Sequence, residues 1–158
     1  MQNKAEKIEY LLQKYGSSLF RLCLFLLKNE ADAEDVIQET FLKYLQKAPT
    51  FADAEHEKAW LFRVASNACL DILRYQQRHP QEEPDVERYL PTEPKNTEIL
   101  DALLGLPEKY RLVLILYYVE GYRINEIAEI IRKSPSAVKM RLQKGRKLLK
   151  TAYGKEER

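Results

Sequence analysis

Apolar residues recur every three or four positions along almost the whole chain outside its middle, and no stretch alternates every second residue. Because that spacing places side chains on one face of a helix, the pattern predicts an all-α protein. Helices are expected from residue 8 to Leu27, from Asp32 to just before Pro49, and over 56–77, 99–104, 107–120, 124–132 and 135–152. The residues expected to face inward in the first three helices are Ile8, Leu11, Leu12, Tyr15, Val36, Ile37, Phe41, Tyr44, Leu45, Trp60, Leu61, Val64, Ala65, Ala68 and Ile72.

The middle of the chain has a different composition. Residues 76–98 contain four prolines, many acidic residues and few apolar ones, a mixture that is typical of an extended linker. The sequence therefore predicts two small helical domains, 1–75 and 99–158, joined by this linker.

Charge is distributed unevenly between these segments. Residues 1–75 carry 10 basic and 11 acidic side chains, a net charge of −1, and residues 76–98 carry 3 and 6, a net charge of −3. Residues 99–158 carry 13 basic and 7 acidic side chains, which gives a net charge of +6. The carboxy-terminal domain is therefore the part expected to bind a polyanion.

The sequence lacks the motifs of simple enzymes and of metal sites. It has no Gly-rich phosphate loop, nucleophile elbow or Cys-x-x-Cys pair, and Trp60 stands where the second histidine of a His-Glu-x-x-His motif would follow His56. Cys23 and Cys69 are flanked by apolar residues and are expected in the core. No cofactor or metal is predicted. No apolar run is long enough to span a bilayer, and the first residues do not resemble a secretory signal, so a cytoplasmic protein is expected.

The last two predicted helices have the spacing of a helix-turn-helix, whose second helix enters the DNA major groove. On that second helix Val138, Leu142, Gly145 and Leu149 fall on one face and are expected to pack inward. Six basic residues occupy the other faces, with no acidic residue between Ser134 and Lys150. A basic helix face is usually only solvated, but here the basic face, the short turn and the Ser134 cap coincide on one element, which favours DNA binding.

These residues resemble region 4 of bacterial sigma factors of the extracytoplasmic-function type. The resemblance covers residues 106–111 (LPEKYR), 122–131 (YRINEIAEII) and 136–142 (SAVKMRL). It implies that this helix reads the minus-thirty-five promoter element, with Ser136, Lys139, Met140, Gln143 and Lys144 nearest the bases and Arg141 and Arg146 on phosphates. Arg132 replaces the usual turn glycine, where a non-glycine residue is expected to carry strain, and Ala137 and Met140 stand where threonine and serine are common.

The amino-terminal domain resembles sigma region 2 independently. Residues 32–41 (DAEDVIQETF) are similar to region 2.2, and they place Asp35, Gln38 and Glu39 on an outward polar face. Such a face alone would more often be only solvated. The resemblance implies that these three residues dock on the clamp helices of the RNA polymerase β′ subunit.

Residues 58–74 (KAWLFRVASNACLDILR) are similar to sigma regions 2.3 and 2.4. Melting DNA requires a protein to capture bases outside the stack with aromatic and amide groups. By resemblance, residues 51–57 form the specificity loop. The side chains implied to bind the melted minus-ten element are Phe51, His56, Arg63, Asn67 and Arg74.

Together the matches cover about residues 8–75 and 99–150 in family order, so the chain is identified as a non-catalytic sigma factor. The expected partners are core RNA polymerase, through the β′ clamp helices and the β flap, promoter DNA, and an anti-sigma factor, which in this family is often membrane-anchored. Two alternatives are a dimeric, free-standing helix-turn-helix regulator and a helical enzyme that uses carboxylates such as Glu34, Asp35 and Glu39. The first leaves the region 2 motifs unexplained, and the second needs acids that converge in a pocket.

Overall fold

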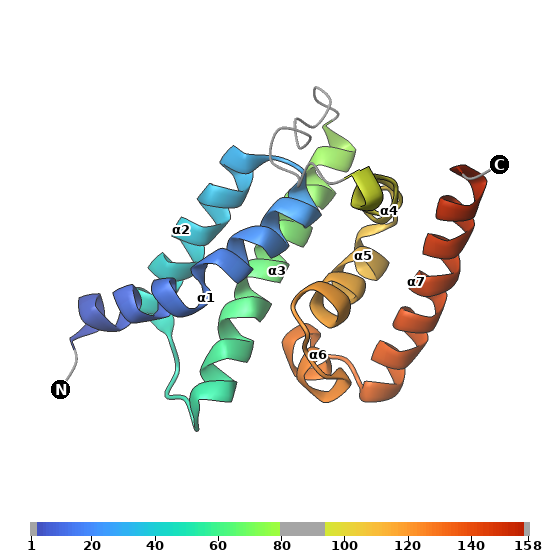
Figure 1. Cartoon of the computed structure of the whole chain (residues 1–158). Helices are drawn as coiled ribbons and strands as arrows, with labels where there is room; N and C mark the ends of the chain where they lie inside the picture. Colours follow the sequence, from blue (N-terminus) through green and yellow to red (C-terminus); the bar gives the residue numbers. More distant parts are fainter. Residues whose placement is uncertain (1–2, 80–93, 157–158) are drawn as a thin grey trace. The chain divides into compact units, whose positions relative to one another are not determined.

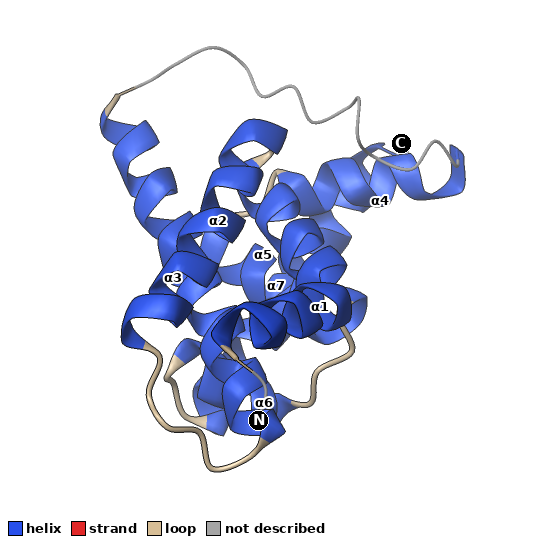
Figure 2. Cartoon of the chain, turned by 90° about the vertical axis from the view of Figure 1, so that its left-hand side faces the viewer, coloured by secondary structure: helices blue, strands red, loops and turns tan. Residues whose placement is uncertain are grey.

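The computed structural model describes residues 3–79 and 94–156, which are helical apart from their connections (Figures 1 and 2). No strand occurs in these two ranges, in agreement with the predicted all-α class. The chain divides into two compact units, Met1–Pro84 and Asp85–Arg158. The centre of the predicted linker lies outside the described residues, but its two ends, 76–78 and 94–98, belong to helices.

The first unit contains three helices, α1 (Lys4–Leu27), α2 (Glu30–Lys47) and α3 (Ala54–Arg78), each of which packs on the other two. Each helix starts at a side chain that accepts a hydrogen bond from the third residue beyond it. Asn3, Asn29 and Asp53 fill this role, at 2.8, 2.9 and 2.8 Å respectively. Such caps satisfy amide groups that have no partner in the first turn of a helix.

The core of the first unit confirms most of the predicted inward positions. Its fully buried side chains include both cysteines, Cys23 on α1 and Cys69 on α3. The Cys23 thiol and burial together raise the pKa of Cys69. The other members of this core include Leu11, Leu19, Leu22, Leu26, Val36, Leu61, Phe62 and Ala65.

Four of the sequence predictions for this unit are wrong. The first helix starts at Lys4 and not at residue 8. Leu12 and Leu45 are 41% and 40% exposed, because each lies at the edge of its apolar stripe. The second helix starts at Glu30 and not at Asp32, since Asn29 supplies its cap and the acidic run follows inside the first turns.

The second unit contains α4 (Pro94–Leu104), α5 (Glu108–Leu114), the π-helix η2 (Ile115–Val119), α6 (Ile124–Ile131) and α7 (Pro135–Glu156). Helices α4, α5 and α6 all pack on α7. The helix predicted over 107–120 is therefore an α-helix that widens into a π-helix. Gly121 follows with a φ of 75°, a conformation that favours glycine.

The Arg111 side chain connects α5 to the end of α4. Its side chain is 4% exposed, and its guanidinium donates to the carbonyl oxygens of Leu104 at 2.8 Å and Leu106 at 2.9 Å. These bonds satisfy carbonyl groups at and just beyond the end of α4, which the helix itself leaves without partners. Burial lowers the pKa of Arg111.

Among the described residues, no helix is long and apolar enough to cross a membrane.

Candidate polymerase and nucleic-acid interfaces

The outward face of α2 carries the three residues predicted to dock on polymerase. Asp35, Gln38 and Glu39 are all exposed, and Glu39 forms an ion pair with Lys43 at 3.2 Å, one turn further on. The opposite side of the same helix buries Val36 and other apolar residues. The structure thus brings the predicted patch together on one surface.

An open groove of about 570 Å³ lies beside this patch, between α1 and α2. It is lined by Leu12, Gly16, Ser17, Phe20, Glu34, Ile37 and Gln38. Gly16 adds no side chain to its wall, and a Cβ atom at this position would lie 3.9 Å from Leu12 Cδ2. The groove was not predicted from the sequence, because the periodic pattern assigned Leu12 and Ile37 to the core.

Phe51 and His56, predicted to contact the melted minus-ten element, do lie together. Their ring centroids are 5.4 Å apart and their planes are nearly perpendicular. The Nδ1 atom of His56 accepts a hydrogen bond from the backbone amide of Ala52 at 3.1 Å. This contact closes the loop in front of α3 and orients the imidazole.

An aromatic cluster behind Phe51 was missed in the sequence, where its members were assigned only to the core. The Phe51 ring lies nearly parallel to Tyr44 at 6.1 Å, and its edge contacts Trp60 at 5.8 Å between centroids. Tyr44 and Trp60 also touch, at 6.0 Å. The loop is therefore held by stacking and edge contacts between rings.

A buried carboxylate fixes one member of this cluster. Glu57 is 8% exposed, accepts a hydrogen bond of 2.7 Å from the Tyr44 hydroxyl, and pairs with the Lys7 ammonium at 3.5 Å. Burial, with the nearby Glu57 carboxylate, raises the pKa of Tyr44. Glu57 thus links the start of α1, the end of α2 and the start of α3. An acidic residue in the first turn of a helix reads as an ordinary surface position in the sequence, which explains why it was missed.

The remaining predicted minus-ten residues follow along α3. Arg63 is half-buried, Asn67 is exposed, and exposed Arg74 pairs with Asp71 at 3.2 Å. His56 precedes Asn67 by eleven residues, which corresponds to about 16 Å along a helix axis. The predicted side chains therefore form a line down α3 that begins at the loop.

The predicted helix-turn-helix is present in the second unit as α6 and α7. The Arg123 amide donates to the Glu126 carboxylate at 2.9 Å at the start of α6, and the Ala137 amide donates to Ser134 Oγ at 3.1 Å at the start of α7. Between them Arg132 has φ 55° and ψ 48°, the left-handed conformation. Arg132 therefore adopts the conformation that glycine favours.

The inward face of α7 packs as predicted. Val138 and Leu142 are buried, and Leu149 is half-buried. A Cβ atom at Gly145 would lie 3.2 Å from Leu114 Cδ1 and 3.5 Å from Tyr110 Cβ. Glycine at this position therefore permits the close approach of α7 to α5.

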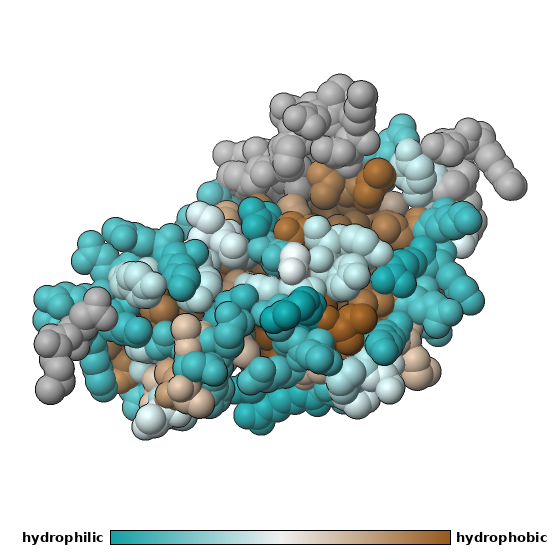
Figure 3. Space-filling view, turned by 60° about the horizontal axis from the view of Figure 1, so that its bottom comes forward, coloured by the Kyte–Doolittle hydropathy of each residue, from teal (hydrophilic) through white to brown (hydrophobic). Residues whose placement is uncertain are grey.

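The outward face of α7 presents the predicted DNA-contacting residues to solvent, and Figure 3 shows the hydrophilic surface over this helix on its right-hand side. Met140 is 69% exposed. The other exposed members of the predicted set are Ser136, Lys139, Gln143, Lys144 and Arg146, while Arg141 is half-buried. The arrangement matches a recognition helix with one packed face and one basic face.

Two tyrosines that the sequence analysis overlooked hold Arg146. Its Nε donates to the Tyr118 hydroxyl at 2.6 Å, and its guanidinium lies 5.8 and 5.7 Å from the ring centroids of Tyr117 and Tyr118. Both tyrosines belong to the π-helix η2. Arg146 is therefore oriented before any DNA binds. The Lys144 ammonium lies 5.7 Å from the ring of another tyrosine, Tyr110.

Comparison with known proteins gives matches over both units. Residues 11–79 match the model of sigma-70 region 2, and residues 96–149 match that of sigma-70 region 4. The chain is 30% identical over 147 residues to the RNA polymerase sigma factor SigV of Bacillus subtilis, covering 90% of this chain and 89% of that protein. It is also 30% identical over 160 residues to the ECF sigma factor SigX of the same organism, at 92% and 82% coverage.

Two solved structures share the fold. The sigma factor RpoE of Bartonella quintana, in complex with the anti-sigma factor NepR, has a TM-score of 0.72 at 22% identity, with 92% of this chain and 96% of that chain covered. CnrH, in complex with the cytosolic domain of CnrY, has a TM-score of 0.71 at 24% identity, with 90% and 84% covered. A free-standing helix-turn-helix regulator would not account for the match to region 2. The chain belongs to the sigma-70 family and is an extracytoplasmic-function sigma factor, a non-catalytic subunit that directs promoter recognition by RNA polymerase through regions 2 and 4.

Proposed function

We propose that the two units divide promoter recognition between them. The exposed patch of Asp35, Gln38 and Glu39 docks on the β′ clamp helices of the polymerase, and the second unit also contacts the β flap. The 51–57 loop and the polar line along α3 capture the melted minus-ten strand. The basic face of α7 reads the minus-thirty-five element in the major groove.

The observation that carries this proposal is the coincidence of exposure and chemistry at the predicted positions. The α2 patch is acidic and polar, the loop carries the half-buried rings of Phe51 and His56, and α7 presents basic and amide groups. Aromatic rings stack on unpaired bases, while cations and amides on a helix suit phosphates and base edges in duplex DNA. The chemistry of each surface therefore complements that of the partner assigned to it.

The cellular setting follows from this function. Because its partners would be RNA polymerase and promoter DNA, the protein would act in the cytoplasm. Two proteins that share the fold form complexes, RpoE of Bartonella quintana with the anti-sigma factor NepR and CnrH with the cytosolic domain of CnrY. By analogy, an anti-sigma factor would hold this chain inactive.

In vitro transcription with core polymerase on genomic DNA, followed by mapping of start sites, tests the proposal and identifies the promoters. The change of Gln38 and Glu39 to Ala should weaken binding to core polymerase. A matched control changes Glu9 and Gln13, an exposed carboxylate and an exposed amide on α1, to Ala. Equal core binding by both double variants would show that the α2 patch is not the docking surface.

A further inference from the structure

Tyr118 of η2 is an exposed aromatic residue for which the sequence predicted no role. It is 57% exposed, and its hydroxyl oxygen accepts the 2.6 Å hydrogen bond from Arg146 Nε. Tyrosine is enriched at interfaces, because its ring packs on apolar groups while its hydroxyl forms hydrogen bonds. Since the oxygen is the acceptor in the bond to Arg146, the hydroxyl can still donate its own hydrogen.

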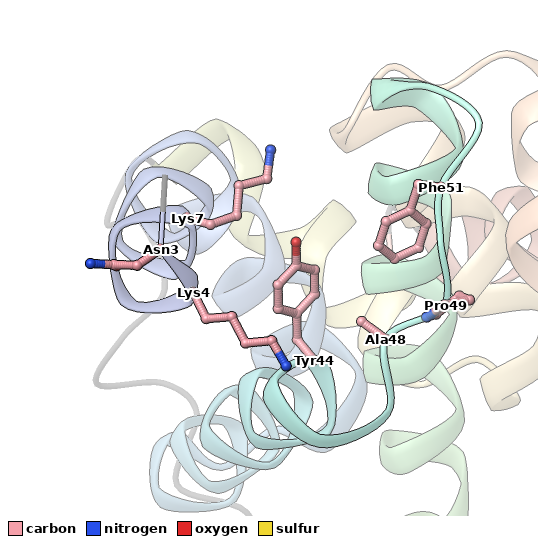
Figure 4. Close-up of a pocket in the computed structure, with 7 residues that line it drawn as sticks. All are labelled: Asn3, Lys4, Lys7, Tyr44, Ala48, Pro49 and Phe51. Carbon is pink, nitrogen blue, oxygen red and sulfur yellow. The ribbon is translucent and has the colours of Figure 1, made fainter. Parts of the chain in front are cut away.

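The hydroxyl of Tyr44 in the first unit is used differently. Tyr44 lies between Lys7 and Phe51 in Figure 4, and its hydroxyl donates to the buried Glu57 carboxylate at 2.7 Å. That donor is satisfied inside the protein. Within residues 3–79 and 94–156, no oxygen accepts a hydrogen bond from the Tyr118 hydroxyl. Tyr118 therefore keeps a donor for a ligand.

Arg146 keeps donors of its own beside this hydroxyl. Its guanidinium lies 5.8 and 5.7 Å from the ring centroids of Tyr117 and Tyr118, whose planes are inclined by 77°. Its Nε is bonded to Tyr118, and its two terminal nitrogens have no hydrogen-bond or ion-pair partner among the residues that the structure describes. A charged donor and a hydroxyl donor thus lie side by side, joined by the hydrogen bond between them.

This pair of donors suits a phosphate. The positive guanidinium polarises the hydroxyl to which it donates, and hydrogen bonds in such a chain strengthen one another. A phosphate accepts several hydrogen bonds at once, and guanidinium is a strong partner for it. On α7 itself, no acidic residue between Ser134 and Lys150 competes for these donors.

We propose that Tyr118 and Arg146 together bind one phosphate of the minus-thirty-five duplex, with the Tyr118 hydroxyl and the terminal nitrogens of Arg146 donating to its oxygens. The inference rests on the proposed role of α7 in reading that element. Phosphate contacts fix the register of a protein on DNA without carrying sequence information. Because η2 precedes the helix-turn-helix, Tyr118 adds a contact from outside it. Both side chains are held in place before DNA binds, so little conformational freedom is lost on binding.

The test measures binding of the full-length chain to a short duplex that carries the minus-thirty-five element of a mapped promoter. Tyr118→Phe keeps the ring beside Arg146 and removes the hydroxyl. It should weaken binding to the cognate and to a scrambled duplex by the same factor, about tenfold, as expected for one hydrogen bond to a charged group. The slope of log affinity against log salt should not change, because no charge is removed.

The control for this measurement is Tyr10→Phe, which removes the hydroxyl of a tyrosine that is 45% exposed on α1 of the first unit. Thermal unfolding checks that each variant is folded at the temperature of the titration. Affinity in Tyr118→Phe equal to that of the control would overturn the proposal.

A second measurement locates the phosphate. Each phosphate of the duplex is replaced in turn by an uncharged methylphosphonate, and the loss of affinity is compared between proteins. One replacement should weaken binding of the wild-type chain more than that of Tyr118→Phe and of Arg146→Ala, at the same position for both variants. Reduced sensitivity at two different positions would contradict a shared phosphate. Weaker binding by Tyr118→Phe with undiminished sensitivity at the Arg146 position would mean that Tyr118 only orients Arg146, and direct donation would be wrong.

Failure of this inference can be separated from failure of the proposed function. If Lys144→Ala reduces the difference in affinity between cognate and scrambled duplexes while Tyr118→Phe changes nothing, α7 reads the element and the Tyr118 contact is wrong. If neither Lys144→Ala nor Arg146→Ala affects binding, the placement of α7 in the groove fails, and this inference fails with it.

Discussion

Replacement of Arg132 by Gly should stabilise the second unit. Arg132 has φ 55° in the turn between α6 and α7, and a left-handed conformation costs a non-glycine residue about 1–2 kcal/mol. Glycine removes that cost but loses about 0.5–1 kcal/mol more through the entropy of its unfolded chain. The expected net gain is about 0.5–1 kcal/mol, which raises the melting temperature of a domain of this size by about 2–8 °C.

The chain offers a matched control and a built-in assay for this prediction. Lys28 has φ 59° at the end of α1 in the first unit, so Lys28→Gly should relieve the same strain there. Trp60 is the only tryptophan and is buried in the first unit, so its fluorescence follows that unit, whereas circular dichroism follows both. Arg132→Gly should raise the melting temperature only of the transition that circular dichroism detects without a change in Trp60 fluorescence.

A graded series makes the prediction stricter. Asn tolerates the left-handed conformation better than other side chains do, so the stability of the second unit should rise from Arg132 through Asn to Gly. If Gly leaves that unit unchanged or less stable while Lys28→Gly stabilises the first, contacts of the Arg132 side chain outweigh its backbone strain, and the reasoning is refuted.

Three further outcomes are expected. Asn67→Ala should reduce permanganate reactivity of the minus-ten region more than closed-complex binding, with stability unchanged within about 0.5 kcal/mol; undiminished melting would count against a role in base capture. Arg146→Ala should weaken binding to cognate and scrambled minus-thirty-five duplexes alike and lower the slope of log affinity against log salt by about one. Lys144→Ala should instead reduce the difference in binding free energy between the two duplexes by about 1–3 kcal/mol. Equal losses of affinity for both duplexes in Lys144→Ala would assign Lys144 to phosphates. Gly145→Val should destabilise the second unit by about 1–3 kcal/mol in thermal unfolding, because its side chain would press on buried Leu114; unchanged stability would mean that α5 and α7 can separate.

The sequence predicted the helices and the buried faces well where the apolar stripe is wide. It was less successful at the edges of these stripes, where Leu12 and Leu45 are exposed although their spacing suits the core. A one-dimensional period gives the direction of a side chain but not whether a neighbouring helix reaches it. That difference decides whether the residue is buried or lines a groove.

The residues predicted to form interfaces are exposed or half-buried in the structure, but the side chains that orient them could not be predicted. Tyr118 holds Arg146 from 28 positions away, and Glu57 holds Tyr44 across two helices. Such contacts depend on how helices pack, and local sequence patterns do not contain that information. The family pattern marked Arg132 only as a position where glycine is usual, and its left-handed backbone conformation was established by the structure.

The π-helix at Ile115–Val119 marks a place where the chain carries one residue more than an α-helix needs. A wider turn accommodates that residue in the space of an ordinary turn, and the amides of Glu120 and Tyr122 close it by bonding back to Ile115 and Leu116. Deletion of a single residue here would restore ordinary helical winding and leave the elements beyond it in nearly the same direction. Deletion of a residue within α5 would instead rotate everything beyond it by about 100°, and α7 would face a different direction although none of its own residues had changed. A deletion should therefore be tolerated better in this short segment than in α5.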